Sequence, residues 1–418
     1  MSVHPPAESF IVDAPLRASG GGMRIAPLCV AAVLIFALLV ARDVAGSGFA
    51  LSIGGEALWG RDFVNVHSSG LLALQGKLGI LYDVEAYRAF QAQAYDSGLR
   101  GHNYSDPPVT LLYTWLFALL PYPVAALAWL GGTAALFVAA ARPYLVRASL
   151  PAWIALLAPA SLMNVWAGHY GFLIGALWLA AFYHLPRRPL LAGVLLGLMI
   201  VKPHLAVLAP LILLARREWG AIAAAALTAA GLALLSAVLF GADLWVTYLT
   251  ETSRVQAAMV DDTRTFFITM MPTLTPALVL AGLPLAAAGV CQAAVALGAV
   301  ALLLKRLPTD SMDAGLAGAA ATFLVLPYGF AYDMTAAGLG ALLLYRRAPE
   351  GPRRTVMLMV ALVPMSVLLF NAAALPLAPA LIAAQLFVAL GLRRERAATP
   401  GAPAYGQSPT AQTFKKDT

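Results

Sequence analysis

Apolar runs long enough to cross a lipid bilayer recur along the whole sequence, and they restrict the fold more than any other feature. Clear examples are residues 25–41, 124–141, 220–240 and 375–392. A spanning helix needs about 20 mostly apolar residues, and here 61% of the residues are hydrophobic while 11% are charged. The alternating pattern of a transmembrane barrel is absent from the sequence. The backbone N–H and C=O groups must therefore form their hydrogen bonds within helices. The sequence therefore predicts an all-α, polytopic transmembrane helical bundle.

Clusters of Arg and Lys assign a side to each connection, because short positively charged loops stay in the cytoplasm. With both ends inside and about 12 spans, 19 of the 27 Lys and Arg residues lie on the cytoplasmic side. The predicted spans are 25–42, 124–141, 150–166, 171–185, 189–201, 204–215, 219–240, 284–304, 313–328, 333–345, 355–371 and 375–392. Several are shorter than a bilayer and must tilt, kink or be shielded from lipid by other helices.

Two further apolar segments, 109–120 and 272–283, are too short to add full crossings beside their neighbours. We expect them to form re-entrant or interfacial helices on the extracytoplasmic face. The predicted organisation is a cytoplasmic segment (1–24), a transmembrane domain (25–394) with a first extracytoplasmic loop at 43–123, and a disordered cytoplasmic tail (395–418). That tail is rich in Ala, Thr, Pro, Gln and Gly, a composition typical of disorder.

The first span could instead belong to a cleaved signal peptide. Arg42 and Asp43 stand where the small residues of a cleavage site would be expected, which favours an uncleaved anchor. Cys29 and Cys291 both lie in apolar segments, so neither a disulfide nor structural zinc is predicted. The net charge of +7 follows from the cytoplasmic arginines, and it indicates anionic membrane lipids as partners rather than nucleic acid.

Polar residues that interrupt the apolar pattern gather on the predicted outer face. Asp62 heads the longest polar stretch, about twenty residues past the first span, and is our candidate catalytic residue. Lys202 lies between two apolar helices, with no acid next to it in the sequence. An ammonium at membrane depth is costly and usually functional, and a phosphate is a suitable ligand for it. The alternative is a lysine that reaches out to the lipid headgroups.

Two histidines in outer connections, His169 and His204, are candidates to donate hydrogen bonds to a phosphate or sugar oxygen. They could equally form hydrogen bonds to backbone groups that are left unpaired where the helices break. A metal site is the weakest alternative. Five more residues are possible substrate contacts: Tyr82, Tyr104, Tyr328, Tyr332 and Asp333. The alternative is an aromatic belt for Tyr328 and Tyr332, and a helix-capping or pairing acid for Asp333. The pair Asp261-Asp262 is expected to be solvated in an outer loop, 241–271.

Seven short motifs occur in one order along the chain. They are Asp62-Phe63; Gly76 to Leu81-Tyr82; Pro107-Pro108; Leu120-Pro121 to Trp129; Gly168 with Gly171; Ala192-Gly193-Val194 to Lys202-Pro203; and Pro327-Tyr328 to Tyr332-Asp333. In this order the chain resembles glycosyltransferase family 87, which includes polyprenyl-phosphate-mannose-dependent mannosyltransferases. The likeness runs from about residue 56 to 346.

The resemblance implies a C-type glycosyltransferase fold in the bacterial inner (plasma) membrane, with the active site on the extracytoplasmic side. Asp62 matches the catalytic carboxylate of the family and Lys202 the basic residue of its Lys-Pro pattern. The implied donor is a polyprenyl-phosphate sugar, mannose or another hexose, and the acceptor is an envelope glycolipid or polysaccharide. Three positions depart from the pattern: His169 and His204, where Gln is more common, and Asp106, where an aromatic residue is more usual.

The expected chemistry is a one-step inverting transfer that needs neither a metal nor a cofactor. One carboxylate takes the proton of the acceptor hydroxyl, and a fixed cation stabilises the charge that develops on the leaving phosphate. A multi-pass transporter or lipid flippase would also have many spans and intramembrane polar residues, but paired repeats with broken helices, which would support it, are not evident. A non-catalytic scaffold would leave Asp62 and Lys202 unexplained.

Overall fold

The computed structural model describes residues 25–48, 50–55, 57–261 and 265–397. The predicted cytoplasmic segment 1–24 lies outside the described residues, as does the predicted tail from residue 398 on. Helix α18 continues to Ala397, so the first three residues of the predicted tail are helical.

Within the described residues, five helices are long and apolar enough to cross a membrane, and each coincides with a predicted span. They are α1 (Ala26–Ser47), α5 (Tyr122–Arg147), α10 (Trp219–Phe240), α14 (Leu285–Lys305) and α17 (Pro352–Ala372). Helix α10 buries only Ala221 and Ser236, so its apolar surface faces outward along nearly its whole length. Such a helix is stable only where its surroundings are as apolar as its side chains.

The shorter helices fill the space between the long ones. They are α6 (Pro159–Ala167), α7 (Gly171–His184), α8 (Pro189–Leu198), α9 (Ala209–Ala215), α13 (Leu274–Leu280), α15 (Ser311–Val325) and α16 (Thr335–Arg347). Helix α18 (Leu377–Ala397) has 21 residues, as many as α14 and α17. Eleven of the 13 residues of α16 are buried. Because neighbouring helices shield them, these segments do not need the full length of a bilayer. The total of 12 crossings stays a prediction.

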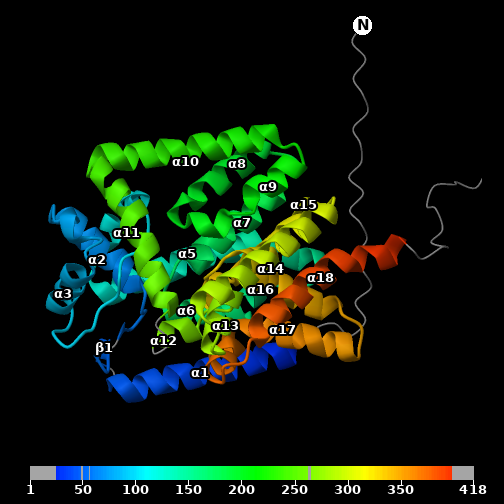
Figure 1. Cartoon of the computed structure of the whole chain (residues 1–418), viewed down its shortest axis with the longest axis horizontal. Helices are drawn as coiled ribbons and strands as arrows, with labels where there is room; N and C mark the ends of the chain where they lie inside the picture. Colours follow the sequence, from blue (N-terminus) through cyan, green and yellow to red (C-terminus); the bar gives the residue numbers. More distant parts are fainter. Residues whose placement is uncertain (1–24, 49, 56, 262–264, 398–418) are drawn as a thin grey trace, which may run out of the picture.

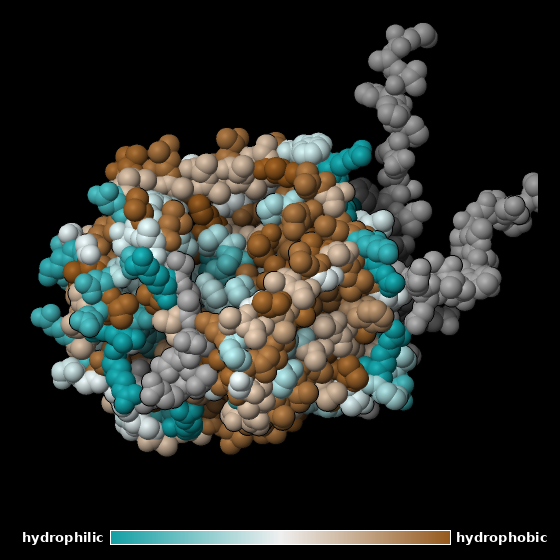
Figure 2. Space-filling model, viewed as in Figure 1, coloured by the Kyte–Doolittle hydropathy of each residue, from teal (hydrophilic) through white to brown (hydrophobic). Residues whose placement is uncertain are grey.

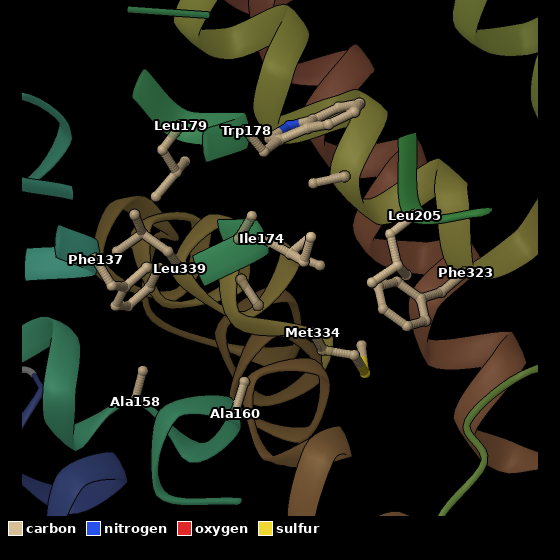
Figure 3. Close-up of a cluster of buried hydrophobic side chains, with 14 of the residues drawn as sticks. Phe137, Ala158, Ala160, Ile174, Trp178, Leu179, Leu205, Phe323, Met334 and Leu339 are labelled. Atoms are coloured by element: carbon tan, nitrogen blue, oxygen red, sulfur yellow. The ribbon is translucent and has the colours of Figure 1, made fainter. Parts of the chain in front are cut away.

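Large side chains from four of these helices form the centre of the bundle. Figure 3 shows Phe137 of α5, Trp178 of α7, Phe323 of α15 and Leu339 of α16 converging on one buried cluster. All four are at most 3% exposed. This core fixes α7 and α16, the helices that follow the connections Gly168–Tyr170 and Pro327–Met334.

One predicted span, 150–166, is not a continuous helix. It consists of the 3-10 helix η4 (Ala152–Leu157) and α6, separated by an extended residue, Ala158. Pro159 is the first residue of α6 and explains the break, since proline disfavours helical geometry in the residue before it. Two more spans are similarly divided, because the 3-10 helices η5 (Met199–Val201) and η6 (Pro203–Ala206) surround Lys202.

The first loop is more structured than the polar stretch predicted from the sequence. It contains the hairpin β1 (Ser52–Ile53) and β2 (Ala57–Leu58), the 3-10 helices η2 (Leu78–Ile80) and η3 (Pro108–Thr110), and the helices α2 (Phe63–Leu74), α3 (Val84–Ala94) and α4 (Leu111–Ala118). Nine of the 12 residues of α2 are buried. The polar stretch predicted at 43–123 thus contains a helix, α2, whose side chains pack within the protein.

The predicted outer loop 241–271 is also helical. It forms α11 (Ala242–Asp261) and α12 (Phe266–Thr269). The separate 327–333 connection, after α15, contains the 3-10 helix η7 (Ala331–Asp333). Asp262 of the Asp261-Asp262 pair lies outside the described residues. The segment predicted as interfacial at 109–120 forms η3 and α4, and that at 272–283 forms α13.

Figure 1 shows α1, α10 and α18 running roughly along the long axis, with α2, α3 and β1 gathered at one end of the molecule. Helix α18 ends at the opposite end. In Figure 2, hydrophobic residues dominate the middle of the surface, and hydrophilic residues collect at the two ends. The arrangement is that of a bundle with its polar ends outside a lipid layer.

Candidate active site

Asp62 is held at the start of α2 by contacts from α1 and α6. The Arg61 guanidinium donates to both oxygens of Asp43 at 2.8 Å and stacks on the Trp166 ring, 3.8 Å from its centroid. The Trp166 indole N–H donates to the same Asp43 carboxylate at 2.8 Å. The Asp62 backbone N–H donates to Ala167 O at 2.9 Å. Charge-assisted bonds of this kind are strong when buried, so the position of Asp62 is fixed from both sides.

Two glycines of the α6–α7 connection let three segments meet at this point. Gly168 has φ of +70°, and a Cβ there would collide with the Gly60 carbonyl, two residues before Asp62. A Cβ on Gly171 would collide with the Tyr332 carbonyl and the Asn164 side chain. The motif Gly168 with Gly171 thus brings the first loop and η7 together around His169.

Replacement of Gly171 by Ala should therefore destabilise the protein by about 1–3 kcal/mol and lower its activity, because the added methyl must displace backbone. Gly289→Ala is the matched control, since a Cβ on Gly289 of α14 would meet nothing within 4 Å. Thermal unfolding in detergent measures both changes. Equal melting temperatures for the two variants would mean that this close approach does not exist.

Asp62 makes a direct hydrogen bond to His102, a residue that sequence analysis did not identify. His102 Nδ1 lies 3.0 Å from Asp62 Oδ1, and both residues are 7% exposed. Burial by itself would raise the pKa of the Asp62 carboxyl, but the hydrogen bond from His102 and other polar neighbours outweigh it and lower the pKa to about 2. Asp62 is then ionised at neutral pH, so His102 Nδ1 donates to it. In the neutral imidazole this leaves Nε2 with its lone pair.

A layer of buried amides orients His102. Its backbone N–H donates to Gln91 Oε1 at 2.6 Å, and Gln91 Nε2 donates to Asn65 Oδ1 at 3.2 Å. Asn65 Nδ2 donates to the carbonyl of Asn103 at 3.0 Å. These bonds fix the 101–103 backbone and hence the side from which the imidazole approaches Asp62.

Lys202 has an acid partner, which comes from a distant part of the sequence. Its ammonium donates to both Asp333 oxygens at 2.8 Å and lies 3.1 Å from His169 Nδ1. The side chain of Asp333 is fully buried. An ammonium has three N–H donors, and all three are engaged, so a further ligand would have to displace one of them.

The same contact sets the tautomer of His169. Because an ammonium only donates, His169 Nδ1 accepts and Nε2 carries the hydrogen. Burial lowers the pKa of His169 well below its ordinary value, which keeps the ring neutral. The ring also stacks on Tyr332 at a centroid distance of 5.1 Å.

His102 and His169 line one cavity of about 340 Å³. Its walls include Asp62 and Asn65 from the first loop, Arg88 from α3, Val255 and Ala258 from α11, Phe267 from α12, and Phe330 and Tyr332 before α16. One wall therefore offers an unshared imidazole lone pair and another offers an imidazole N–H. Lys202 and Asp333 lie directly behind His169 and Tyr332.

The remaining predicted contacts are not among the residues that line this cavity. Tyr82 donates to the Asp106 carbonyl at 2.8 Å, and Tyr104 shares a hydrogen bond with Thr110. These tyrosines thus support the 104–110 backbone. His204 is half-buried and packs on Tyr328, with 5.9 Å between ring centroids. The structure thus joins Asp62, His169, Lys202, Tyr332 and Asp333, and it leaves His204, Tyr82, Tyr104 and Tyr328 at the periphery.

A helical membrane bundle that encloses a polar cavity with a base and a hydrogen-bond donor on its walls has the form of a membrane-embedded enzyme. The profile of glycosyltransferase family 87 matches residues 104–327, just over half of the chain. The chain belongs to this family and is a membrane glycosyltransferase. Comparisons with curated proteins and with solved structures found no match. His169, His204 and Lys202 lie inside the matched region, whereas Asp62 and His102 precede it.

Proposed function

We propose that this glycosyltransferase moves a hexose, mannose or a close relative, from a polyprenyl-phosphate donor to an envelope glycolipid or polysaccharide. The reaction takes place on the extracytoplasmic face of a bacterial inner membrane, on a C-type glycosyltransferase fold, with inversion at the anomeric carbon. The observation that carries this proposal is the pair Asp62–His102 facing His169 across one cavity.

Asp62 and His102 form the base in this scheme. As the acceptor hydroxyl attacks the anomeric carbon, its proton passes to the pair and its oxygen forms the new glycosidic bond. The bond from the anomeric carbon to the phosphate oxygen breaks on the opposite face, and its electrons leave with the polyprenyl phosphate. One displacement of this kind inverts the anomeric centre.

The leaving phosphate is stabilised by His169 and Lys202. His169 offers its Nε2–H to the cavity, and the Lys202 charge lies behind it at 3.1 Å from the other ring nitrogen. Negative charge develops on the phosphate as its bond to the sugar breaks. A fixed hydrogen-bond donor and a buried cation therefore stabilise the transition state more than the bound donor. His204 lies beyond Lys202 and would act only on a more distant part of the donor.

The polyprenyl chain requires an apolar route from the bilayer to the cavity. Leu116 of α4 and Leu119, just after the end of this helix, are 48% and 62% exposed to the surroundings. Figure 2 shows a recess between α11 and α14 with hydrophilic residues at its floor and hydrophobic surface beside it. A lipid could lie along such a surface with its phosphate directed into the protein.

Labelling of single cysteines tests the side of the membrane. Ser97→Cys and Ser149→Cys are isosteric changes at exposed positions, the first in the loop after α3 and the second after α5. In a variant that lacks Cys29 and Cys291, an impermeant maleimide should modify Cys at 97 in spheroplasts and Cys at 149 only after permeabilisation. The reverse pattern would place Asp62 in the cytoplasm and contradict the extracytoplasmic assignment.

Mass spectrometry of envelope glycolipids and polysaccharides, with and without the gene, tests the acceptor. We expect one product that lacks a single hexose in the deletion strain, restored by the wild-type chain and not by its Asp62→Asn variant. An unchanged glycan profile would contradict the proposed acceptor class.

A further inference from the structure

Asp106 carries a buried carboxylate without a partner. The residue is 4% exposed, and among the described residues its side chain makes neither a hydrogen bond nor an ion pair. Its contact is through the backbone, where its carbonyl accepts the Tyr82 hydroxyl at 2.8 Å. An isolated ionised carboxylate is strongly unfavourable in a buried position unless it is neutralised, so this position calls for a physical explanation.

The backbone holds Asp106 in place. Thr110 Oγ1 donates to the Pro107 carbonyl at 2.8 Å, and Pro107-Pro108 restricts the following turn. Ser105, the preceding residue, lines the active-site cavity. Asp106 therefore directly follows a cavity-lining residue, on a segment whose backbone these contacts hold.

The charges around Asp106 are unbalanced. Asp62, Asp333 and Lys202 are the charged groups near it, and Lys202 is already paired with Asp333. The tyrosine hydroxyls that face this group stay neutral near pH 7, because burial raises their pKa values; they belong to Tyr82, Tyr104, Tyr113, Tyr170, Tyr248 and Tyr332. Three carboxylates, Asp106 included, thus lie near one ammonium, and the Arg88 guanidinium on the cavity wall is a further cation. Within this group an ionised Asp106 would repel an anionic phosphate.

Burial raises the pKa of the Asp106 carboxyl to about 7, a rise that Lys202 partly opposes. In the free protein this group is then close to half protonated at neutral pH. A phosphate anion brought into the same low-dielectric space would favour the protonated form further, since like charges repel strongly there.

We propose that Asp106 takes up a proton from solvent when the anionic donor binds, and that its carboxyl O–H then donates a hydrogen bond to the donor phosphate. This inference rests on the proposed polyprenyl-phosphate donor. Protonation removes one of the three carboxylate charges and provides a hydrogen-bonding O–H group. Lys202 does not provide such a group, because all three of its N–H groups are already engaged. It also gives the unpaired carboxyl a partner in the loaded enzyme.

Binding of a short polyprenyl methyl phosphodiester to the full chain in lipid nanodiscs tests the inference, because this probe does not titrate between about pH 6 and 9. Wild-type affinity should fall roughly tenfold per pH unit above about pH 7, since each bound ligand requires one proton. Asp106→Asn keeps an N–H donor and the same shape, so the affinity of this variant for the probe should not decrease in this way as the pH rises. The histidines are common to both proteins, and the difference between the two curves isolates Asp106.

Asp83→Asn is the matched control, because Asp83 is an exposed cap that accepts from the backbone N–H groups of Glu85 and Ala86. The affinity of Asp83→Asn for the probe should decrease with rising pH as that of the wild type does. Calorimetry in two buffers of different ionisation enthalpy gives a readout that needs no variant: about half a proton or more should be taken up per probe bound near pH 7.

Equal pH dependence in wild type and Asp106→Asn would overturn the inference and leave the proposed function standing. So would weaker binding of Asp106→Asn by the same factor at every pH, which would mean that Asp106 acts through its shape and packing and not through a proton. Absence of probe binding by wild type and both variants would instead overturn the donor assignment, and this inference with it.

Discussion

Replacing Asp62 by Asn is expected to lower kcat by about 100- to 10,000-fold while donor binding stays close to that of the wild type. The amide keeps the size of the carboxylate but cannot accept a proton. It also no longer requires His102 to donate from Nδ1, so the lone pair on Nε2 is no longer fixed toward the cavity. Both effects act on proton removal, which occurs in the transition state and not in the bound donor complex.

Single-turnover transfer and equilibrium donor binding, measured on the same preparation, separate the two quantities. His102→Gln should cost nearly as much as Asp62→Asn, and the double variant little more than either, because residues that act as a unit are not additive. Near-normal turnover in Asp62→Asn would move the search for the base to Asp106. Asp83 would remain a poor alternative, because its carboxylate caps α3.

Lys202→Ala is expected to impair stability, donor binding and turnover together. It would leave the fully buried Asp333 carboxylate without its ion partner, a change that typically costs about 3–5 kcal/mol in other proteins. It would also free His169 Nδ1, so the ring could rotate or change tautomer and withdraw Nε2–H from the cavity. Since the phosphate is present in ground and transition states, KM and kcat should both change.

The double variant Lys202→Ala, Asp333→Ala separates stability from function. Removal of both charges eliminates the unpaired anion, so the melting temperature should recover in part while donor binding stays weak. Full recovery of binding in the double variant would show that Lys202 serves only to neutralise Asp333. A Lys202→Ala variant as stable as the wild type would contradict the ion pair itself.

The sequence was sufficient for the features that depend on local composition. The five long helices were predicted because each is a continuous apolar run, and Asp62 and Lys202 stood out as polar residues in unusual surroundings. The break at Ala158 was missed although Pro159 is visible, because hydropathy averaged over a window does not register a single proline. The burial of α2 was missed because its apolar residues are diluted by Asn, His and Ser side chains that are also buried.

The partners of the site residues were beyond sequence reasoning for a different reason. Asp333 is 131 positions from Lys202, and His102 is 40 positions from Asp62. No spacing rule links residues that only tertiary packing brings together. The Gly168 and Gly171 motif carried part of this information, since paired glycines in a connection indicate close approach of other backbone. It did not say which segments approach.

The most direct test of the account is transfer by the purified protein from a radiolabelled polyprenyl-phosphate hexose to a glycolipid extract of the native membrane. The account predicts labelled glycolipid with the wild type, loss of label incorporation with Asp62→Asn at unchanged donor binding, and no transfer from the corresponding nucleotide sugar. Transfer from the nucleotide sugar alone, or equal transfer by wild type and Asp62→Asn, would contradict it.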